Sequence, residues 1–164
     1  MADFAQLDDN NVVINAIVVS DEDVIDKVAW WDPLKLFTGK RNSEEVGISF
    51  CHKLFGDDTN WKETRSTGWG RGTFRGNKAS PGMTYMTDVK TLGVASTDIF
   101  INNQPFPSWS IGIQTALWVP PGPPGWEPKL TQFEKSHNMR YIWDEEKYKL
   151  NPNNAWVLIS RSRL

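Results

Sequence analysis

The chain carries the run Gln104-Pro-Phe-Pro-Ser-Trp-Ser-Ile-Gly-Ile-Gln-Thr-Ala-Leu-Trp-Val-Pro-Pro-Gly-Pro-Pro124. Two apolar segments in it, residues 108–111 and 116–119, each hold one Trp, and Gly112-Ile-Gln-Thr115 between them fits a hairpin loop containing Gly. The flanking prolines cannot donate backbone hydrogen bonds to a strand ladder, so strand pairing is expected to end at them. The run predicts a β-hairpin bounded by proline.

A second Trp hairpin is predicted closer to the C-terminus. Its first part is Tyr141-Ile-Trp-Asp-Glu-Glu-Lys-Tyr148, in which Trp143 leads into an acidic turn. The returning strand is Ala155-Trp-Val-Leu-Ile159. Asn151-Pro-Asn-Asn154 makes its turn longer than that of the first hairpin. Residues 125–137 between the hairpins are predicted to form a loop with one helical turn.

The N-terminal residues predict another hairpin. Phe4-Ala-Gln-Leu7 and residues 12–19 have strand character, and Asp8-Asp-Asn-Asn11 between them favours a turn. The second strand is apolar on both faces except at Asn15. Both of its sides therefore need cover, from this chain or from a neighbouring molecule.

One helix is predicted over residues 43–55. Ser43 is its expected N-cap, acidic residues occupy its first turn, and Gly56 is its expected C-terminal stop. At 100° per residue, one side is apolar and includes Cys51, Leu54 and Phe55, whereas His52 faces water without a partner. The helix is expected to lie on a sheet, with a strand over residues 60–65 directly after it.

Residues 67–82 combine five glycines with Arg71, Arg75 and Lys78. This composition is typical of an extended loop or arm with a local positive patch.

Ile99-Phe-Ile101 predicts a further strand. The fold class is therefore mainly β, of the α+β type, with antiparallel hairpins and one amphipathic helix. Residues 1–66 and 83–164 are expected to form one compact unit, joined by the arm of residues 67–82.

Composition excludes several classes of protein. The net charge of -2 gives no overall field that would attract nucleic acid or an anionic membrane, and Met1-Ala-Asp-Phe4 lacks the features of a signal peptide. One Cys and two His supply neither an intramolecular disulfide nor a set of metal ligands. We expect a protein made in a cytoplasm, without cofactor or metal and without direct contact to nucleic acid or membrane. Its nine Trp belong to a core, to an interface or to rings displayed for stacking.

No catalytic constellation emerges, and the chain is not expected to be an enzyme. Acidic pairs occur at Asp8-Asp9, Asp21-Glu-Asp23, Asp57-Asp58 and Asp144-Glu-Glu146. Each of them lies in a predicted turn or helix start, where Asp is favoured for local reasons. Cys51 lies on the apolar side of the helix, and no Gly-x-Ser-x-Gly motif is present.

Several segments resemble one family of proteins. The opening residues 2–19, Gly47-Ile-Ser-Phe-Cys-His-Lys-Leu-Phe-Gly56, Pro105-Phe-Pro-Ser-Trp109 and Tyr141-Ile-Trp-Asp-Glu-Glu146 look like the corresponding parts of small virion structural proteins of tailed phages that infect marine cyanobacteria and other marine bacteria. Order and spacing agree over most of the chain. Residues 24–42 and 127–138 look like insertions relative to that family. The resemblance implies a non-enzymatic component of a phage particle.

These considerations lead to two functional hypotheses. The first is a virion structural protein that decorates or cements the capsid through the major capsid protein and copies of itself. Its predicted interface residues are Trp30, Trp31, Trp69, Arg71 and Arg75. The alternative is a tail or fibre-associated protein that contacts other tail proteins and binds a host surface glycan, with Trp126 and Trp143 exposed for stacking.

Overall fold

The computed structural model describes residues 2–20, 44–65, 75–89, 98–112, 115–123 and 126–160. The chain divides into two compact units, which are described separately below. Unit 1 comprises residues 1–103 and 111–117, and unit 2 comprises residues 104–110 and 118–164. Small antiparallel sheets dominate the described residues, with one long helix, so the predicted mainly β, α+β class is confirmed.

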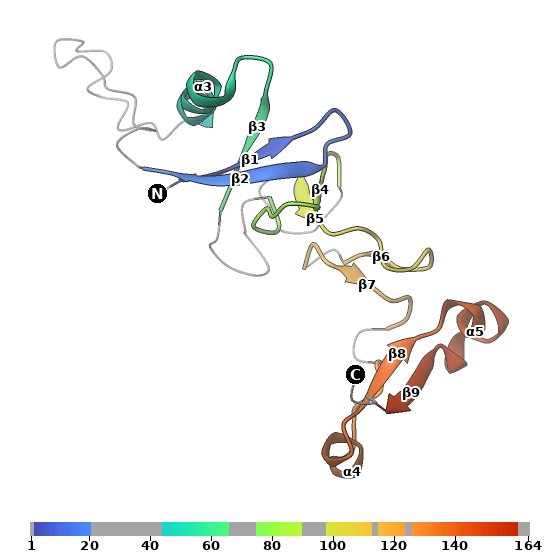
Figure 1. Cartoon of the computed structure of the whole chain (residues 1–164). Coiled ribbons are helices and arrows are strands. Elements are labelled where there is room, and N and C mark those ends of the chain that lie inside the picture. The colour runs from blue at the N-terminus through green and yellow to red at the C-terminus, as the bar shows by residue number, and fades with distance from the viewer. Residues whose placement is uncertain are drawn as a thin grey trace, which may run out of the picture. The chain divides into compact units, whose positions relative to one another are not determined.

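Unit 1 is built on a three-stranded sheet with the order β2-β1-β3 (Figure 1). Its strands β1 (Ala2–Leu7), β2 (Val13–Val19) and β3 (Asn60–Thr64) are antiparallel to their neighbours. The carboxylate of Asp8 accepts hydrogen bonds from the amides of Asn10 and Val12, which closes the turn between β1 and β2. The predicted N-terminal hairpin and the strand after the helix are both confirmed.

Helix α3 (Glu44–Phe55) packs on one face of this sheet. Phe4, Val19, Cys51 and Trp61 form the buried cluster between helix and sheet. A Cβ atom added at Gly47 would lie only 1.9 Å from Cζ of Phe4, so the close approach of α3 to β1 requires the glycine.

The end of α3 partly differs from the prediction. Gly56, with φ of 103°, ends the helix as expected, and its amide donates to the carbonyl of His52. Leu54 and Phe55 were expected on the buried side, but both are exposed, although the ring centroid of Phe55 lies 5.1 Å from that of Trp61 in β3. His52 was expected to lack a partner, yet its Nε2 lies 2.8 Å from the carbonyl oxygen of Thr59. The expected N-cap, Ser43, lies outside the described residues.

The second face of the sheet is partly covered by the end of the Gly-rich segment and by the residues that follow it. Strands β4 (Thr84–Met86) and β5 (Ile99–Ile101) pair with each other, which confirms the strand predicted at 99–101. Tyr85 and Phe100 from this pair join a buried cluster with sheet residues. Residues 75–79 carry buried side chains at Arg75, Asn77 and Ala79, so of the two predicted alternatives, an extended loop or an arm, this part of 67–82 is a packed loop. Residues 66–74 lie outside the described part of the chain.

The first Trp hairpin is present but shorter than predicted. Strands β6 (Ser110–Ile111) and β7 (Trp118–Val119) pair over two residues each. Trp109 precedes β6 and lies in a turn in which its amide donates to the carbonyl of Phe106. Ala116 has a positive φ of 53°, which is incompatible with a strand, so the ladder cannot extend back to it.

Unit 2 contains the second predicted hairpin, formed by β8 (Met139–Trp143) and β9 (Trp156–Ser160). The segment between these strands folds into helix α5 (Glu145–Leu150) and the 3-10 helix η1 (Pro152–Asn154) rather than a simple turn. Helix α4 (Gln132–Ser136), which begins with a capping box, is the helical turn expected within 125–137.

Trp143 is the centre of an aromatic cluster in unit 2. Its ring centroid lies 6.0 Å from that of Trp109, 6.2 Å from Trp126 and 5.4 Å from Trp156, and these contacts are close to edge-to-face. The indole N–H groups of these three neighbours have no conventional acceptor among the described residues. Edge-to-face contacts place the positive edge of one ring against the negative face of another. This electrostatic attraction is favourable for buried rings.

Gly47→Ala tests the close packing of α3 on β1. Helix propensity alone favours alanine by about 1 kcal/mol, whereas the contact with the buried ring of Phe4 predicts a net loss of about 1 to 3 kcal/mol in the free energy of unfolding. Urea unfolding measures the difference. Ser49→Ala, on the exposed side of the same helix, is the control and is expected to change stability by less than about 0.5 kcal/mol. A Gly47→Ala variant as stable as the control would contradict the packing argument.

Candidate interaction surface

The structure places the predicted site residues in different settings. Trp30, Trp31, Trp69 and Arg71 lie outside the described residues, so their predicted interface role stays a prediction. Arg75 is described, and it is only 8% exposed.

Arg75 forms a buried ion-pair network in unit 1. Its Nη1 and Nη2 atoms donate to the carboxylate of Glu44 at 2.5 and 3.0 Å, in a bidentate pair. Its Nε donates to Asp98 at 2.7 Å, and Nη1 also donates to the carbonyl oxygen of Glu63 at 2.8 Å. The guanidinium therefore connects the first residue of α3, strand β3 and the residue before β5. We call Arg75, Glu44 and Asp98 the arginine clamp.

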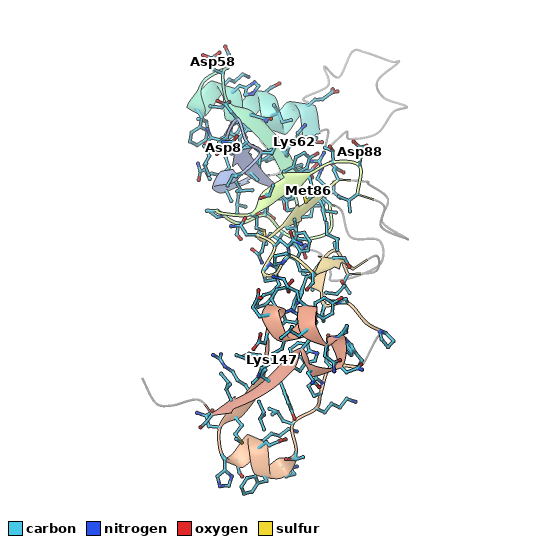
Figure 2. The ribbon with its side chains drawn as sticks, turned by 90° about the vertical axis from the view of Figure 1, so that its right-hand side faces the viewer. Asp8, Asp58, Lys62, Met86, Asp88 and Lys147 are labelled. Atoms are coloured by element: carbon cyan, nitrogen blue, oxygen red, sulfur yellow. The ribbon has the colours of Figure 1, made fainter. Side chains whose placement is uncertain are left out.

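Further donors reinforce the arginine clamp. The amide of Glu63 donates to Glu44 at 2.9 Å, and the hydroxyl of Tyr85 donates to Asp98. The guanidinium carbon also lies 5.8 Å from the ring centroid of Tyr85. Lys62, labelled on β3 in Figure 2, places its ammonium 5.8 Å from the same ring centroid. Cations near an aromatic ring are stabilised by the negative charge on its faces.

The electrostatics of the clamp favour the charged state of both carboxyls. Burial alone would raise the pKa of Glu44, but hydrogen bonds from Arg75 and from the amide of Glu63 outweigh it and lower that pKa. Asp98 behaves in the same way, with Tyr85 and Arg75 as donors. Burial and the neighbouring Asp98 raise the pKa of Tyr85, which keeps its hydroxyl protonated as a donor. The hydrogen bonds described above all join Arg75 to other residues of unit 1. This residue therefore holds unit 1 together and does not present its charge on the surface.

Of the two residues proposed for glycan stacking, Trp143 is buried and Trp126 is half-buried. Trp143 is 5% exposed and lies among four other aromatic rings. Its indole N–H donates to Glu145 at 2.9 Å, and the same carboxylate oxygen accepts from the hydroxyl of Ser108. Trp126 is half-buried, and its Nε1 is covered. A sugar ring therefore has no open indole face at Trp143.

The described acidic pairs fulfil the local roles predicted for them. Asp8 closes a turn, and Asp144 is the N-cap of α5, where its side chain accepts from the amide of Lys147. Within the described part of the chain, His, Cys, Asp and Glu side chains form no group that could hold a metal ion. Burial raises the pKa of the Cys51 thiol to about 11, so this cysteine is not a reactive nucleophile at neutral pH.

The surface most suited to a partner lies on the edge strand β2. Ile14 is 53% exposed and Val18 is 59% exposed, and Ala16 between them is also exposed. We call these three residues the edge surface. The sequence predicts a strand that is apolar on both sides, but strand patterning alone does not reveal which side stays uncovered, so these residues could not be selected from it.

Among the described residues, the backbone of β2 has few partners along its outer edge. Near its start, Val13 exchanges hydrogen bonds of 2.8 Å with Met83 and Gly82. Beyond that point, no described strand other than β1 pairs with β2. Edge strands in soluble proteins are usually protected by charged side chains or proline, and the sequence of β2, VINAIVV, contains neither. An apolar, unprotected edge is typical of a strand that meets another polypeptide.

Comparisons of the chain with protein-family models, with curated proteins and with solved structures gave no match. The resemblance to phage virion proteins therefore stays a prediction from the sequence.

Replacing Arg75 tests whether the clamp holds unit 1 together. Arg75→Met leaves two carboxylates without their partner, and we expect a loss of about 3 to 5 kcal/mol in the free energy of unfolding. Arg75→Lys keeps the charge but loses the bidentate geometry, so its loss should be smaller. Lys78→Met is the control, since Lys78 makes only an exposed ion pair with Asp3, worth at most about 1 kcal/mol. Equal losses for Arg75→Met and Lys78→Met in urea unfolding would refute the assignment.

The clamp also predicts a pH dependence of stability. The folded pKa values of Glu44 and Asp98 are lowered, so the stability they contribute is complete above the unfolded carboxyl pKa of about 4 and is lost as the pH falls through the folded values. In Arg75→Met, protonation removes the unpaired negative charge of the two carboxyls, and this lowers the free-energy cost of burying them. The stability difference between wild type and Arg75→Met should therefore shrink from pH 7 to pH 3. Urea unfolding across this range measures it, and a constant difference would mean that the carboxyls are not coupled to Arg75.

Proposed function

We propose that this chain is a non-enzymatic structural protein of a tailed-phage virion, and that it decorates or cements the capsid by contacting the major capsid protein and copies of itself. The single observation that carries the proposal is the edge surface of β2, where an unprotected strand edge and exposed apolar side chains coincide. The family resemblance of the sequence supports the same class of function.

The edge surface is suited to contacts repeated on a lattice. Full burial of an Ile or Val side chain contributes roughly 1.5 to 3 kcal/mol, and about half of this remains to be gained at Ile14 and Val18. Backbone hydrogen bonds along the edge add direction to this apolar contact. One such contact is weak, but many copies held on one particle act together, and their combined attachment becomes strong.

The arginine clamp supports this role by fixing the sheet that carries the edge surface. The clamp joins α3, β3 and the residue before β5, and β1 lies between β3 and β2. A strand held in this way is already ordered before a partner binds. Binding to a pre-organised edge therefore loses less conformational entropy than binding to a flexible segment.

We propose the virion as the location of the protein after its synthesis in the host cytoplasm. Among the described helices, none has the length and apolar character required to cross a membrane. The alternative role in a tail or fibre requires exposed indoles at Trp126 and Trp143, and the burial of Trp143 gives that role no support. It is kept as one outcome of the experiment that follows.

Cryo-electron microscopy of the intact particle tests the proposal. Many copies of the chain on the capsid lattice, with the edge surface against another protein, are the expected result. A few copies at the tail would instead favour the tail role, and glycan binding would then be measured by quenching of Trp fluorescence. Absence of the chain from purified particles would overturn both roles.

The double variant Ile14→Ser with Val18→Ser tests the edge surface. Loss of two apolar contacts should lower binding to particles that lack the protein by at least about tenfold, because roughly 1.4 kcal/mol corresponds to that factor. Co-sedimentation with such particles measures the bound fraction. Leu150→Ser is the matched control, since Leu150 is 88% exposed in unit 2 and outside the edge surface. Equal binding of the double variant and the control would exclude the edge surface as the contact.

A further inference from the structure

Strand β9 of unit 2 is a second open edge. Its residues Trp156–Ser160, WVLIS, contain no charge and no proline, and its register with β8 is regular over five residue pairs. Figure 1 draws β8 along one side of β9 and no strand along the other, in agreement with the two-stranded order of this sheet in the described chain. The strand therefore lacks the charged residues, the proline and the bulge that often protect an edge.

The backbone of β9 has a defined polarity at this edge. The amide of Asp144 donates to the carbonyl of Ala155 at 2.8 Å, so this carbonyl points toward β8. In a trans peptide the next N–H, that of Trp156, points the opposite way. Because backbone groups alternate along a strand, the N–H and C=O groups of Trp156, Leu158 and Ser160 all face the open edge.

We infer that β9 pairs with β9 of a second copy of this chain, antiparallel and about a two-fold axis through Leu158. In this register Leu158 faces Leu158 of the second copy, and Trp156 faces Ser160. Each of these positions carries outward backbone groups, so each forms a hydrogen-bonded pair. The two hairpins become one four-stranded sheet with the order β8-β9-β9-β8.

The chemistry of the strand favours a second copy over an unrelated partner. A two-fold axis places identical residues near each other, which is unfavourable for strands that carry charge, and β9 carries none. The register also sets Val157 beside Ile159 of the second copy. Together with Ile142, which pairs with Val157 in the hairpin, these residues extend one apolar strip across both copies.

Unit 2 gains stability from this pairing. Among its described apolar residues, only Trp143 and Ala155 are fully buried, whereas Val157, Leu158 and Ile159 are each partly exposed. Isolated two-stranded hairpins are marginally stable in water, and three or more strands with an apolar face are needed for independent stability. Two more strands from a second copy meet that requirement.

The mass of the full-length chain in solution gives the first test. Analytical ultracentrifugation over a roughly hundredfold concentration range should show a monomer–dimer equilibrium for the wild type. Ser160→Pro removes an outward N–H without removing a bond to β8, so the dimer should dissociate with a dissociation constant at least about tenfold higher. Ser160→Ala keeps the N–H and should behave like the wild type.

Disulfide cross-linking tests the register directly. Leu158→Cys places two thiols in facing positions about 5.5 Å apart at Cα, within the range of a disulfide. Val157→Cys is the control, because its two copies would lie about 8 Å apart at Cα, which is too far. With oxidised glutathione as the oxidant, Leu158→Cys should form a covalent dimer, and Val157→Cys should not. The buried native Cys51 remains in both variants.

Three results would overturn the inference. They are a wild type that stays monomeric throughout the concentration range, a dimer that Ser160→Pro leaves intact, and cross-linking that is equal for the two cysteine variants. An intact dimer in Ser160→Pro would direct attention to the edge surface of β2. The pairing needs no phage particle, so its failure and the failure of the proposed virion function are measured separately.

Discussion

The ion pairs of Arg75 are the interaction on which unit 1 depends. One guanidinium joins two carboxylates and a backbone carbonyl that come from a helix, a strand and the residue before another strand. Removal of the guanidinium leaves buried negative charge, which is far more costly than loss of an exposed ion pair. The clamp thus explains how a unit with a small sheet and short additional strands maintains one arrangement.

The two units satisfy their apolar groups to different degrees. Unit 1 has two buried clusters, one on each face of its sheet, and leaves mainly the edge strand β2 and the end of α3 exposed. Unit 2 relies on rings packed around Trp143 and leaves its hairpin with open edges. The edge strands β2 and β9 carry no charged residue, which is more typical of an assembling protein than of an isolated one.

Patterns of residues that lie close together in the sequence were sufficient to predict much of the fold. Residues with strand character on both sides of a turn-favouring cluster located β1 and β2, and Gly56 located the end of α3. Core packing was one of three roles left open for the tryptophans, and Trp109 and Trp156 do pack on Trp143. The length of the first Trp hairpin was overestimated, because apolar composition does not reveal the positive φ of Ala116.

The sequence alone therefore established the local elements, since turn and helix-end preferences act over a few residues. It did not reveal the roles of Arg75 or of Trp143. Arg75 looked like part of a positive arm, because its partner Glu44 lies 31 residues away and Asp98 lies 23 residues away. Burial and ion pairing depend on which distant segments meet, so only the folded chain shows that Arg75 is internal and that Ile14 and Val18 are exposed.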